Sequence, residues 1–378
     1  MNQTGNISPT KPGAGDRSRS KKFTPIGIIF TLAGVLLFAY FVKRAGVGSV
    51  LDGIKRLGAG FLIVLAISAV RHIARSLAWM KCFEEPDRLG FRDAFRARLM
   101  GDALGNIVPF ASMFVSEPSK PALIRDRVPL MAGLSAIAIE NIFYSLSVAV
   151  FIFSGMTALL LTFHLPKALR FASIGGLIFI FLLISGATIV IRKQWKFLSG
   201  ALEYVYGRGV ARRWLETGRA RVSTFEDRIY GFYERNRSRF LLILILETCF
   251  HLAGVLEIYV TLSFISFALA PTFFTAFILE SVNRVINVVF KFVPMRMGVD
   301  EFGTGKVSGI LKFAETTGVT LAIVRKGRDL FWTAVGVAFL LHRGISLRGA
   351  ARDAEAAIAK EAEKSAAALP QVRTNESG

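Results

Sequence analysis

The sequence predicts an all-α, polytopic integral membrane protein with about seven to eight transmembrane helices, because a hydrocarbon core of about 30 Å needs about 20 apolar residues per span. The chain has 378 residues, of which 53% are hydrophobic and 33 are phenylalanine, although its net charge is +20. Apolar runs of about span length recur along most of the chain. Proline, glycine and charged residues interrupt two of these runs, which predicts two broken or re-entrant segments.

The basic residues lie in segments between and beside the apolar runs, where they report the orientation of the chain in the membrane. Nucleic-acid binding is excluded as an explanation of the charge, because no nucleic-acid-binding module is visible. Cys82 and Cys249 give neither a disulfide framework nor a metal-binding spacing. We therefore expect no cofactor, no metal and no nucleic-acid partner.

The chain begins with a disordered basic tail over residues 1–22, which we place in the cytoplasm. The apolar run Ile26–Val42 follows and predicts a first membrane helix rather than a signal peptide, because no small-residue cleavage site follows it. Apolar residues recur at helical spacing over Val47–Leu57, which predicts a short amphipathic helix at the membrane interface.

Two charged spans follow in the first half, residues 23–191. Phe61–Phe83 carries Arg71 and Arg75 on one helical face, which is costly unless they face protein, water or an anion. For Arg75, snorkelling to the nearby helix end is the alternative. The span Val128–Phe153 contains a single charge, Glu140, near mid-depth, so this carboxyl needs a partner or a proton.

The stretch Leu99–Val115 between these spans is weakly apolar and is interrupted by Asn106 and Pro109, with Glu117 just beyond. This pattern predicts two half-helices that enter and leave on one side of the membrane. The almost uncharged residues 154–167 predict an external loop.

A featureless span, Phe171–Ile191, ends the first half. Residues 192–239 hold twelve Lys or Arg against five acids and show helical apolar spacing. They predict an amphipathic cytoplasmic connection against an anionic leaflet, although a plain basic loop fits equally well. The second half, residues 240–342, begins with the span Phe240–Phe264. It contains Glu247 and His251 one turn apart, a spacing typical of a satisfied pair rather than a metal site.

The second broken stretch is the apolar run Phe273–Val293, which leads into a Pro/Gly break. Five polar residues share one stripe of this run, because helical neighbours recur every three to four positions: Glu280, Asn283, Arg284, Asn287 and Lys291. The last span, Val319–Leu341, is interrupted by charges that include Arg328 and Asp329, and the Ala/Glu/Lys-rich residues 343–378 predict a cytoplasmic tail.

The two broken stretches predict an internal repeat. Acids follow Pro109 at Glu117, and they follow Pro294 at Asp300 and Glu301. A span with polar residues beside aromatic ones then follows each break: Glu140 to Tyr144 in the first half, and Arg328 to Trp332 in the second. Flanking charges place the first break on the inner side and the second on the outer side, which is the pattern of an inverted repeat.

These motifs resemble those of the lysylphosphatidylglycerol synthase membrane-domain family, also called flippase-like domain proteins. Pro294-Met-Arg-Met-Gly298-Val-Asp300-Glu301 resembles the family's "P-x-x-x-G-x-x-E" element, and Gly105-Asn106-Ile-Val-Pro109 with Ser116-Glu117 resembles its "N-x-x-P … G-E" element. Ile139-Glu140-Asn141 stands where the family has Glu-Arg, and Arg328 with Phe331-Trp332 resembles its closing Arg-aromatic element. The resemblance covers roughly residues 25–342.

Several positions depart from the family pattern, more of them in the first half. Ser116 replaces a glycine, Asn141 replaces an arginine, Ser119 or Lys120 stands for another arginine, and Tyr144 stands near a usual aspartate. The resemblance implies a flippase-like transmembrane domain over 23–342 without the aminoacyl-transferase domain. It implies a multi-pass protein of the bacterial inner membrane, and the charges that flank the spans predict that both termini lie in the cytoplasm. Its relatives are linked to lipid flipping or to hopanoid and glycolipid pathways.

The function that this resemblance favours is the movement of a polar-headgroup lipid across the membrane: a phospholipid, an aminoacylated lipid, a hopanoid or a glycolipid. Such transport needs a wet groove with cations and half-helix N-termini for the headgroup. The candidate groove residues are Arg71, Arg75, Asn106, Pro109, Glu117, Glu140, Glu280, Asn283, Arg284, Asn287, Pro294, Gly298, Asp300, Glu301, Arg328 and Asp329. Arginine suits a phosphodiester because its fork binds two oxygens.

Two alternatives stay open: an intramembrane transferase acting on a lipid-linked donor, and a membrane scaffold for lipid, hopanoid or glycolipid synthesis. A transferase needs a metal-binding acid pair or a nucleotide site, and Gly303 to Lys306 lacks the P-loop spacing. The expected partners are membrane lipids, and homo-oligomerisation stays open. We also expect Glu117 and the Asp300–Glu301 pair to approach each other, each within salt-bridge range of Arg71, Arg284 or Arg328.

Overall fold

The computed structural model describes residues 40, 43, 47–107, 112–193, 226–266, 269–291, 293 and 296–343, and all regular secondary structure in these ranges is helical. Four of the described helices are long and apolar enough to cross a membrane: Gly60–Lys81, Leu130–Thr162, the Lys167–Gly186 part of a longer helix, and Arg237–Ile265. The predicted first span Ile26–Val42, apart from Tyr40, both tails and most of the 192–239 connection lie outside the described residues.

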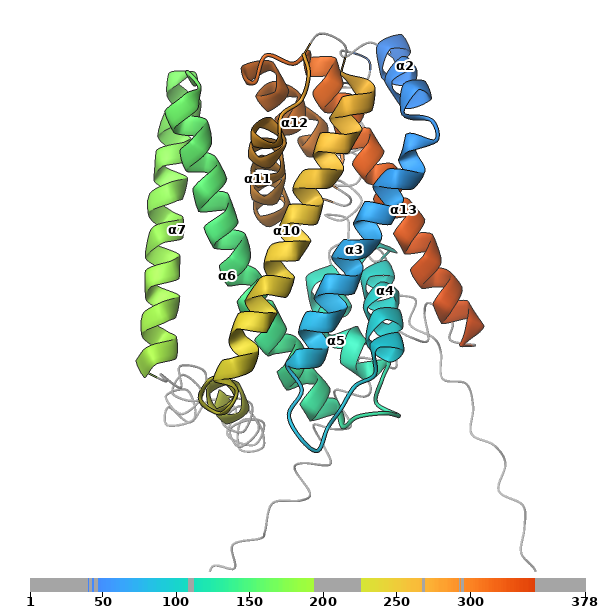
Figure 1. Ribbon diagram of the computed structural model, residues 1–378, viewed down its shortest axis with the longest axis vertical. Coiled ribbons are helices and arrows are strands. Elements are labelled where there is room, and N and C mark those ends of the chain that lie inside the picture. The colour runs from blue at the N-terminus through green and yellow to red at the C-terminus, as the bar shows by residue number, and fades with distance from the viewer. Residues whose placement is uncertain are drawn as a thin grey trace, which may run out of the picture.

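The first half contains six described helices in chain order (Figure 1). They are α2 (Val47–Leu57), α3 (Gly60–Lys81), α4 (Phe91–Ile107), α5 (Ser112–Ala122), α6 (Leu130–Thr162) and α7 (Lys167–Lys193). The predicted interface helix has the bounds of α2, and its apolar Val47 and Leu51 are exposed while Val50 and Leu57 are buried. The predicted break between two short helices lies between α4 and α5.

The second half repeats the order long, short, short, long. Its helices are α10 (Arg237–Ile265), α11 (Phe273–Val289), α12 (Val299–Ile310) and α13 (Glu315–His342), preceded by a helical segment over 226–235. Thr272 caps α11 through a reciprocal hydrogen bond with Thr275. Gly298 precedes α12 with φ 80°, a left-handed conformation that glycine adopts without strain.

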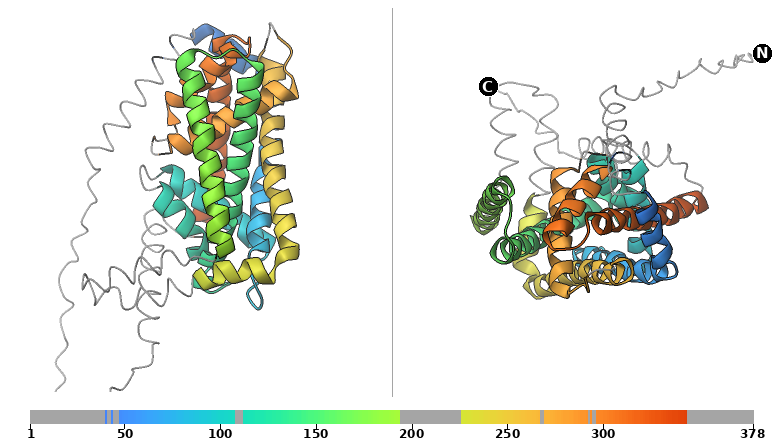
Figure 2. Two further views of the ribbon diagram at one scale, coloured as in Figure 1. Left: turned by 90° about the vertical axis from the view of Figure 1, so that its left-hand side faces the viewer. Right: turned by 90° about the horizontal axis from the view of Figure 1, so that it is seen from above.

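The two short pairs lie at opposite ends of the helical bundle. In Figure 1, α4 and α5 occupy the lower end, whereas α11 and α12 occupy the upper end. The long helices α3 and α10 pack side by side in opposite directions. Each short pair also packs on the other half, because α4 contacts α13 and α11 contacts α6. The view from above in Figure 2 shows α7 set apart from this bundle, in contact with α6.

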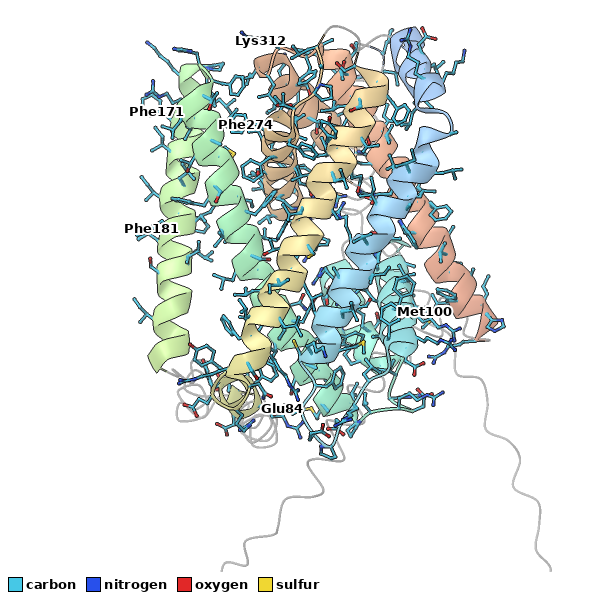
Figure 3. The ribbon with its side chains drawn as sticks, in the orientation of Figure 1. Glu84, Met100, Phe171, Phe181, Phe274 and Lys312 are labelled. Carbon is cyan, nitrogen blue, oxygen red and sulfur yellow. The ribbon has the colours of Figure 1, made fainter. Side chains whose placement is uncertain are left out.

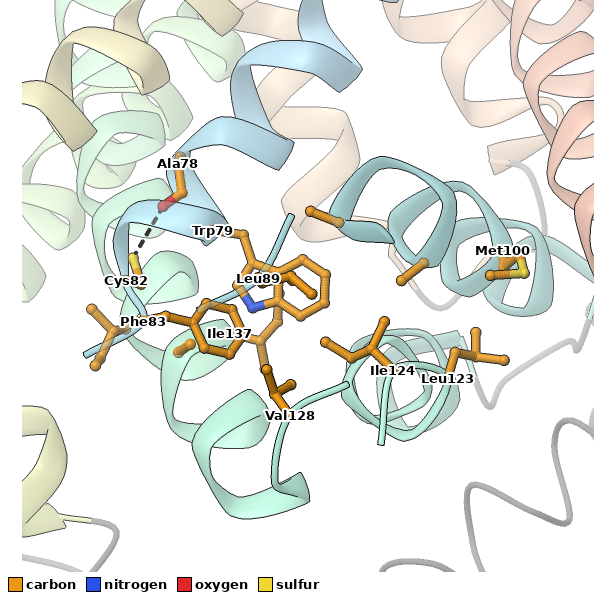
Figure 4. Close-up of a cluster of buried hydrophobic side chains, with 14 of the residues drawn as sticks. Ala78, Trp79, Cys82, Phe83, Leu89, Met100, Leu123, Ile124, Val128 and Ile137 are labelled. Carbon is orange, nitrogen blue, oxygen red and sulfur yellow. Dashed lines mark hydrogen bonds between the residues drawn. The ribbon is translucent and has the colours of Figure 1, made fainter. Parts of the chain in front are cut away.

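Apolar side chains form two clusters, one toward each end. The lower cluster gathers Trp79 of α3 and Phe83, which follows this helix, with Ile124 and Ile137 (Figure 4). The upper cluster gathers residues of α10, α11, α12 and the end of α6, such as Leu262 and Val307. Along α3, the arginines lie between Val64 of the upper cluster and Ala78 of the lower one. A charged layer therefore separates two apolar layers.

Two boundaries differ from prediction. The helix α6 continues to Thr162, so an external loop over 154–167 is wrong. The residues from Ser154 to Thr162 are uncharged and helix-compatible, and Gly155 lets α6 approach Ser281 of α11 closely, so tertiary packing extends the helix. The turn is confined to the residues between Thr162 and Lys167. At the second boundary, α11 ends at Val289, four residues before the apolar run ends at Val293.

Most of the α7 surface is apolar and exposed. Phe171 and Phe181 are labelled on this helix in Figure 3, and both side chains are exposed. In a membrane protein such a surface faces lipid, since no charged residue occupies the window from Phe171 to Gly186.

Candidate functional site

Four arginines from α3, α11, α13 and the start of the α12 region meet three carboxylates inside the bundle, and we call this group the central cluster. It consists of Arg71, Arg284, Arg296, Arg328, Glu257, Glu280 and Asp329. Subtracting three negative from four positive charges leaves one excess positive charge. A buried group of this kind is costly unless its charges are paired and hydrogen-bonded.

Glu257 of α10 bridges two of these arginines. Its Oε2 accepts a hydrogen bond from Arg71 Nη1 at 2.9 Å, and its Oε1 is paired with Arg328 of α13. Both arginine side chains are nearly buried. One carboxylate thus connects α3, α10 and α13, helices that belong to both halves of the chain.

The predicted stripe of α11 supplies the next carboxylate. Glu280 is paired with Arg284 one turn along and accepts a hydrogen bond from Asn283 Nδ2 at 2.9 Å. Arg71 Nη2 lies 3.9 Å from Glu280 Oε1. The guanidinium groups of Arg71 and Arg284 lie 4.8 and 4.6 Å from the centroid of the Phe250 ring, a distance at which cation–π attraction contributes.

Asp329 forms the more open end of the central cluster. Arg328 Nη2 lies 2.7 Å from Asp329 Oδ1, and Arg296 Nη2 lies 3.3 Å from Oδ2. The side chains of Arg296 and Asp329 are 29% and 28% exposed, more than the other members. The cluster is therefore most accessible from this end.

A second group, the Glu140 cluster, lies in the first half. Glu140 Oε1 is 2.7 Å from Arg75 Nη2 and 3.0 Å from Arg98 Nη2, so one carboxylate oxygen serves two arginines. Arg75 also donates to Asn141 Oδ1 at 3.3 Å, and its guanidinium lies 3.8 Å from the centroid of the Tyr144 ring. Arg75 therefore binds inside the bundle, and the snorkelling alternative for it is wrong.

Glu117 of α5 joins the same region. It accepts from Asn141 Nδ2 at 3.0 Å and from Lys120 Nζ at 2.8 Å. Lys120 is buried and also lies 3.0 Å from Asp102. Glu117 and Asp102 are about one third exposed, so this end of the cluster is again the open one.

Asp300 and Glu301 at the start of α12 form a third group with α13. Arg325 Nη1 lies 3.2 Å from Asp300, and Lys326 Nζ lies 2.5 Å from Glu301 Oε1. Glu301 Oε2 also accepts from the Gly298 backbone N–H at 2.7 Å. The expectation that Arg71, Arg284 or Arg328 would pair with Glu117 and with these acids is wrong. Cations one turn away or on the adjacent helix are nearer.

The remaining predicted residues lie around these groups. Asn106, near the end of α4, donates to Thr333 Oγ1 of α13 at 2.9 Å. Asn287 donates to Asn283 Oδ1 at 3.3 Å. Pro109 and Pro294 lie outside the described residues, so the structure tests neither.

Sequence reasoning missed several partners, chiefly Glu257, Arg98, Lys120, Arg325 and Lys326. Glu257 carried a usable signal, because it is an acid inside an apolar span. Arg98 and Lys120 lie in segments rich in charge, where a buried cation does not stand out from solvated ones.

Comparison with protein families gives one match to this chain. The model of the lysylphosphatidylglycerol synthase TM region matches residues 26–336, which includes every helix described here except the end of α13. Neither the curated proteins nor the solved structures gave a match. The matched range takes in all three ion-pair groups and both short helix pairs. The chain therefore belongs to the family of lysylphosphatidylglycerol synthase transmembrane regions.

Proposed function

We propose that this protein moves a lipid with a phosphate-bearing polar headgroup across the bacterial inner membrane, through a groove lined by the central cluster and the Glu140 cluster. The observation that carries the proposal is the buried layer of paired arginines between two apolar layers. Ionisable groups at membrane depth are costly and are kept where a polar substrate passes.

The two halves are, in this proposal, inverted repeats, with α3 to α6 equivalent to α10 to α13. The packing supports this, because α4 lies against α13 as α11 lies against α6. The ion pairs support it as well. Arg75 of α3 pairs with Glu140 of α6, while Glu257 of α10 pairs with Arg328 of α13, which are the equivalent helices with the charges exchanged.

The positive charge of the central cluster supports a lipid headgroup that carries an anionic group. The central cluster carries one excess positive charge, and a phosphodiester can replace a carboxylate on an arginine without leaving the arginine unpaired. The pairs seen here thus keep the arginines satisfied between transport events. Acyl chains would stay in lipid while the headgroup crosses.

The open side of the groove supports lateral entry. Arg296 and Asp329, together with Glu117 and Asp102, are the partly exposed members of their clusters. Arg296 lies just before α12, Asp102 and Glu117 lie on α4 and α5, and Asn106 links α4 to Thr333 of α13, one turn from Asp329. In the full topology we propose seven to eight spans (about 20 residues each) with both termini in the cytoplasm.

The test uses the full chain in vesicles that contain fluorescent lipids, with a membrane-impermeant quencher added outside. Lipids with an anionic phosphate headgroup, a zwitterionic one and a headgroup of sugar alone are compared. We expect the protein to expose the phosphate lipids of both leaflets to the quencher, well above protein-free vesicles. No excess over protein-free vesicles for every headgroup would refute transport and favour a transferase or scaffold role.

A further inference from the structure

The α10 helix contains a buried acid that the three ion-pair groups do not use. The side chain of Glu247 is 0% exposed, and neither of its carboxyl oxygens has a hydrogen-bond partner among the described residues. It lies one turn from Ile243 and three residues from Phe250, both of which are buried in the bundle. Glu247 is therefore flanked by buried apolar side chains of its own helix.

His251, one turn along, does not satisfy this acid. Its Nε2 lies 3.1 Å from Ser147 Oγ, its Nδ1 has no partner within the described part of the chain, and its ring stacks on Phe151 at 4.7 Å. The expectation of a satisfied Glu247–His251 pair is therefore wrong. Glu247 is left as an unpartnered carboxyl at membrane depth.

An ionised carboxylate in this setting would lose its hydration without gaining a donor, at a cost far above that of the neutral acid. Protonation removes the charge and is the least costly way to keep Glu247 buried. The ligand that this site fits is therefore a proton.

The charges near Glu247 indicate how its protonation can be linked to the pairing of a nearby arginine. Arg75 and Arg98 share the single oxygen Oε1 of Glu140, whose other oxygen has no partner among the described residues. Two cations on one carboxylate leave one of them available for a second acid. Arg75 is near α10, since its guanidinium lies 5.8 Å from the centroid of the Phe250 ring.

Charged and titratable groups approach Glu247 from each helix packed beside this part of α10. After burial itself, the charged groups that act on it most strongly are Arg75 of α3, Glu140 of α6, Arg98 of α4 and Arg284 of α11. Arg71, Tyr144 and Glu280 surround the adjacent His251 and Phe250, and Arg328 of α13 is held by Glu257 further along.

We propose that Glu247 is a proton-binding site that couples headgroup movement to protons, an inference that rests on the proposed transport function. Glu247 holds its proton while Arg75 is paired with Glu140. When a movement of α3 relative to α6 during headgroup passage separates Arg75 from Glu140, Arg75 turns to Glu247. The acid O–H bond then breaks, its electron pair stays on the carboxylate, and the proton leaves to water on the side where the groove is open.

Proton binding is tested without transport, by infrared difference spectra of the full chain in lipid between acid and alkaline pH. We expect the carbonyl band of a protonated, apolar-environment carboxyl in the wild type and its loss in Glu247→Gln. Glu85→Gln removes an exposed acid in the loop after α3 and should keep the band. A band that persists in Glu247→Gln would overturn the assignment. Glutamine has the shape of the neutral acid, so this variant should fold.

Coupling is tested in vesicles with and without a transmembrane pH difference, using the fluorescent phosphate lipid. If one proton accompanies each lipid, one pH unit biases the leaflet distribution about tenfold. We expect this bias in the wild type and in Glu85→Gln, and an equal distribution in Glu247→Gln. A bias that persists in Glu247→Gln overturns coupling through this residue. If no variant moves lipid, the transport proposal fails, while the infrared result still decides proton binding.

Discussion

A carboxylate that holds two arginines occurs in both halves of the molecule. Glu257 lies between Arg71 and Arg328, and Glu140 lies between Arg75 and Arg98. Sharing lowers the number of buried acids, and it leaves each arginine with unused donors. A guanidinium has five N–H groups in a fixed fork, so it can bind a phosphate oxygen before it releases its carboxylate. Such exchange avoids a bare charge in a low-dielectric site.

Arg284→Ala should abolish lipid movement and leave the protein folded. Breaking a buried pair typically costs about 3–5 kcal/mol, because the remaining charge is uncompensated. Here the loss should be smaller, since Glu280 keeps Asn283 at 2.9 Å and Arg71 at 3.9 Å. Thermal unfolding in detergent and the vesicle assay, run on the same preparation, measure the two effects.

The matched control for this arginine is Arg88→Ala. Arg88 is 82% exposed and pairs with Glu85 in the loop after α3, so its loss should change neither stability nor transport. Adding Glu280→Gln to Arg284→Ala should recover stability without transport, because it removes the unpaired charge. Transport that survives in Arg284→Ala would remove this residue from the groove.

Several of the site residues found from sequence share one property: each is a charge or amide within an apolar run. Arg71, Glu140 and Arg284 stood out for that reason, and the structure brings them into buried ion pairs. Their partners could not be assigned, because pairing across α3, α10 and α13 depends on tertiary contacts between residues far apart in sequence. Lys120 shows the limit, since a proline-rich charged segment gives no sign that it is buried.

At the scale of helices, glycine sets how closely the halves approach. Gly336 of α13 faces the backbone carbonyl of Leu99 on α4, and Gly155 of α6 faces Ser281 on α11. These glycines lie at two of the contacts in which a long helix of one half meets a short helix of the other. Small residues permit such close approach in membranes, where packing rather than the hydrophobic effect holds helices together.

Gly336→Ala should therefore destabilise the protein, because its Cβ would clash with the Leu99 carbonyl, which cannot rotate away. Overpacking of this kind typically costs about 1–3 kcal/mol. Gly175→Ala in α7 is the control, since no atom lies within 4 Å of a Cβ placed there. Thermal unfolding of both variants in one detergent is the measurement, and equal stability would show that α4 and α13 are not tightly packed.

At the scale of the whole molecule, the order of helices was largely predictable and their lengths were less so. The polar breaks predicted the α4–α5 and α11–α12 pairs, because charge and glycine interrupt an apolar run at a definite place. The end of α6 was not predictable, since an uncharged sequence suits an external loop and a buried helix equally. In the structure this segment is helical and packs on α11, where Gly155 meets Ser281.

The orientation of the molecule in the membrane can be tested by cysteine labelling. The turn between α6 and α7 lies at the end occupied by α11 and α12, and the loop between α3 and α4 lies at the opposite end (Figure 1). The described part of the basic connection, residues 226–239, lies at the latter end, so we predict that this end faces the cytoplasm. Cysteine placed at His164 in a chain without Cys82 and Cys249 should react with an impermeant reagent on intact cells. Cysteine at Asp87 should react only after lysis. The reverse result would invert the membrane orientation and reverse which short pair opens to which side, while leaving the ion-pair groups in place.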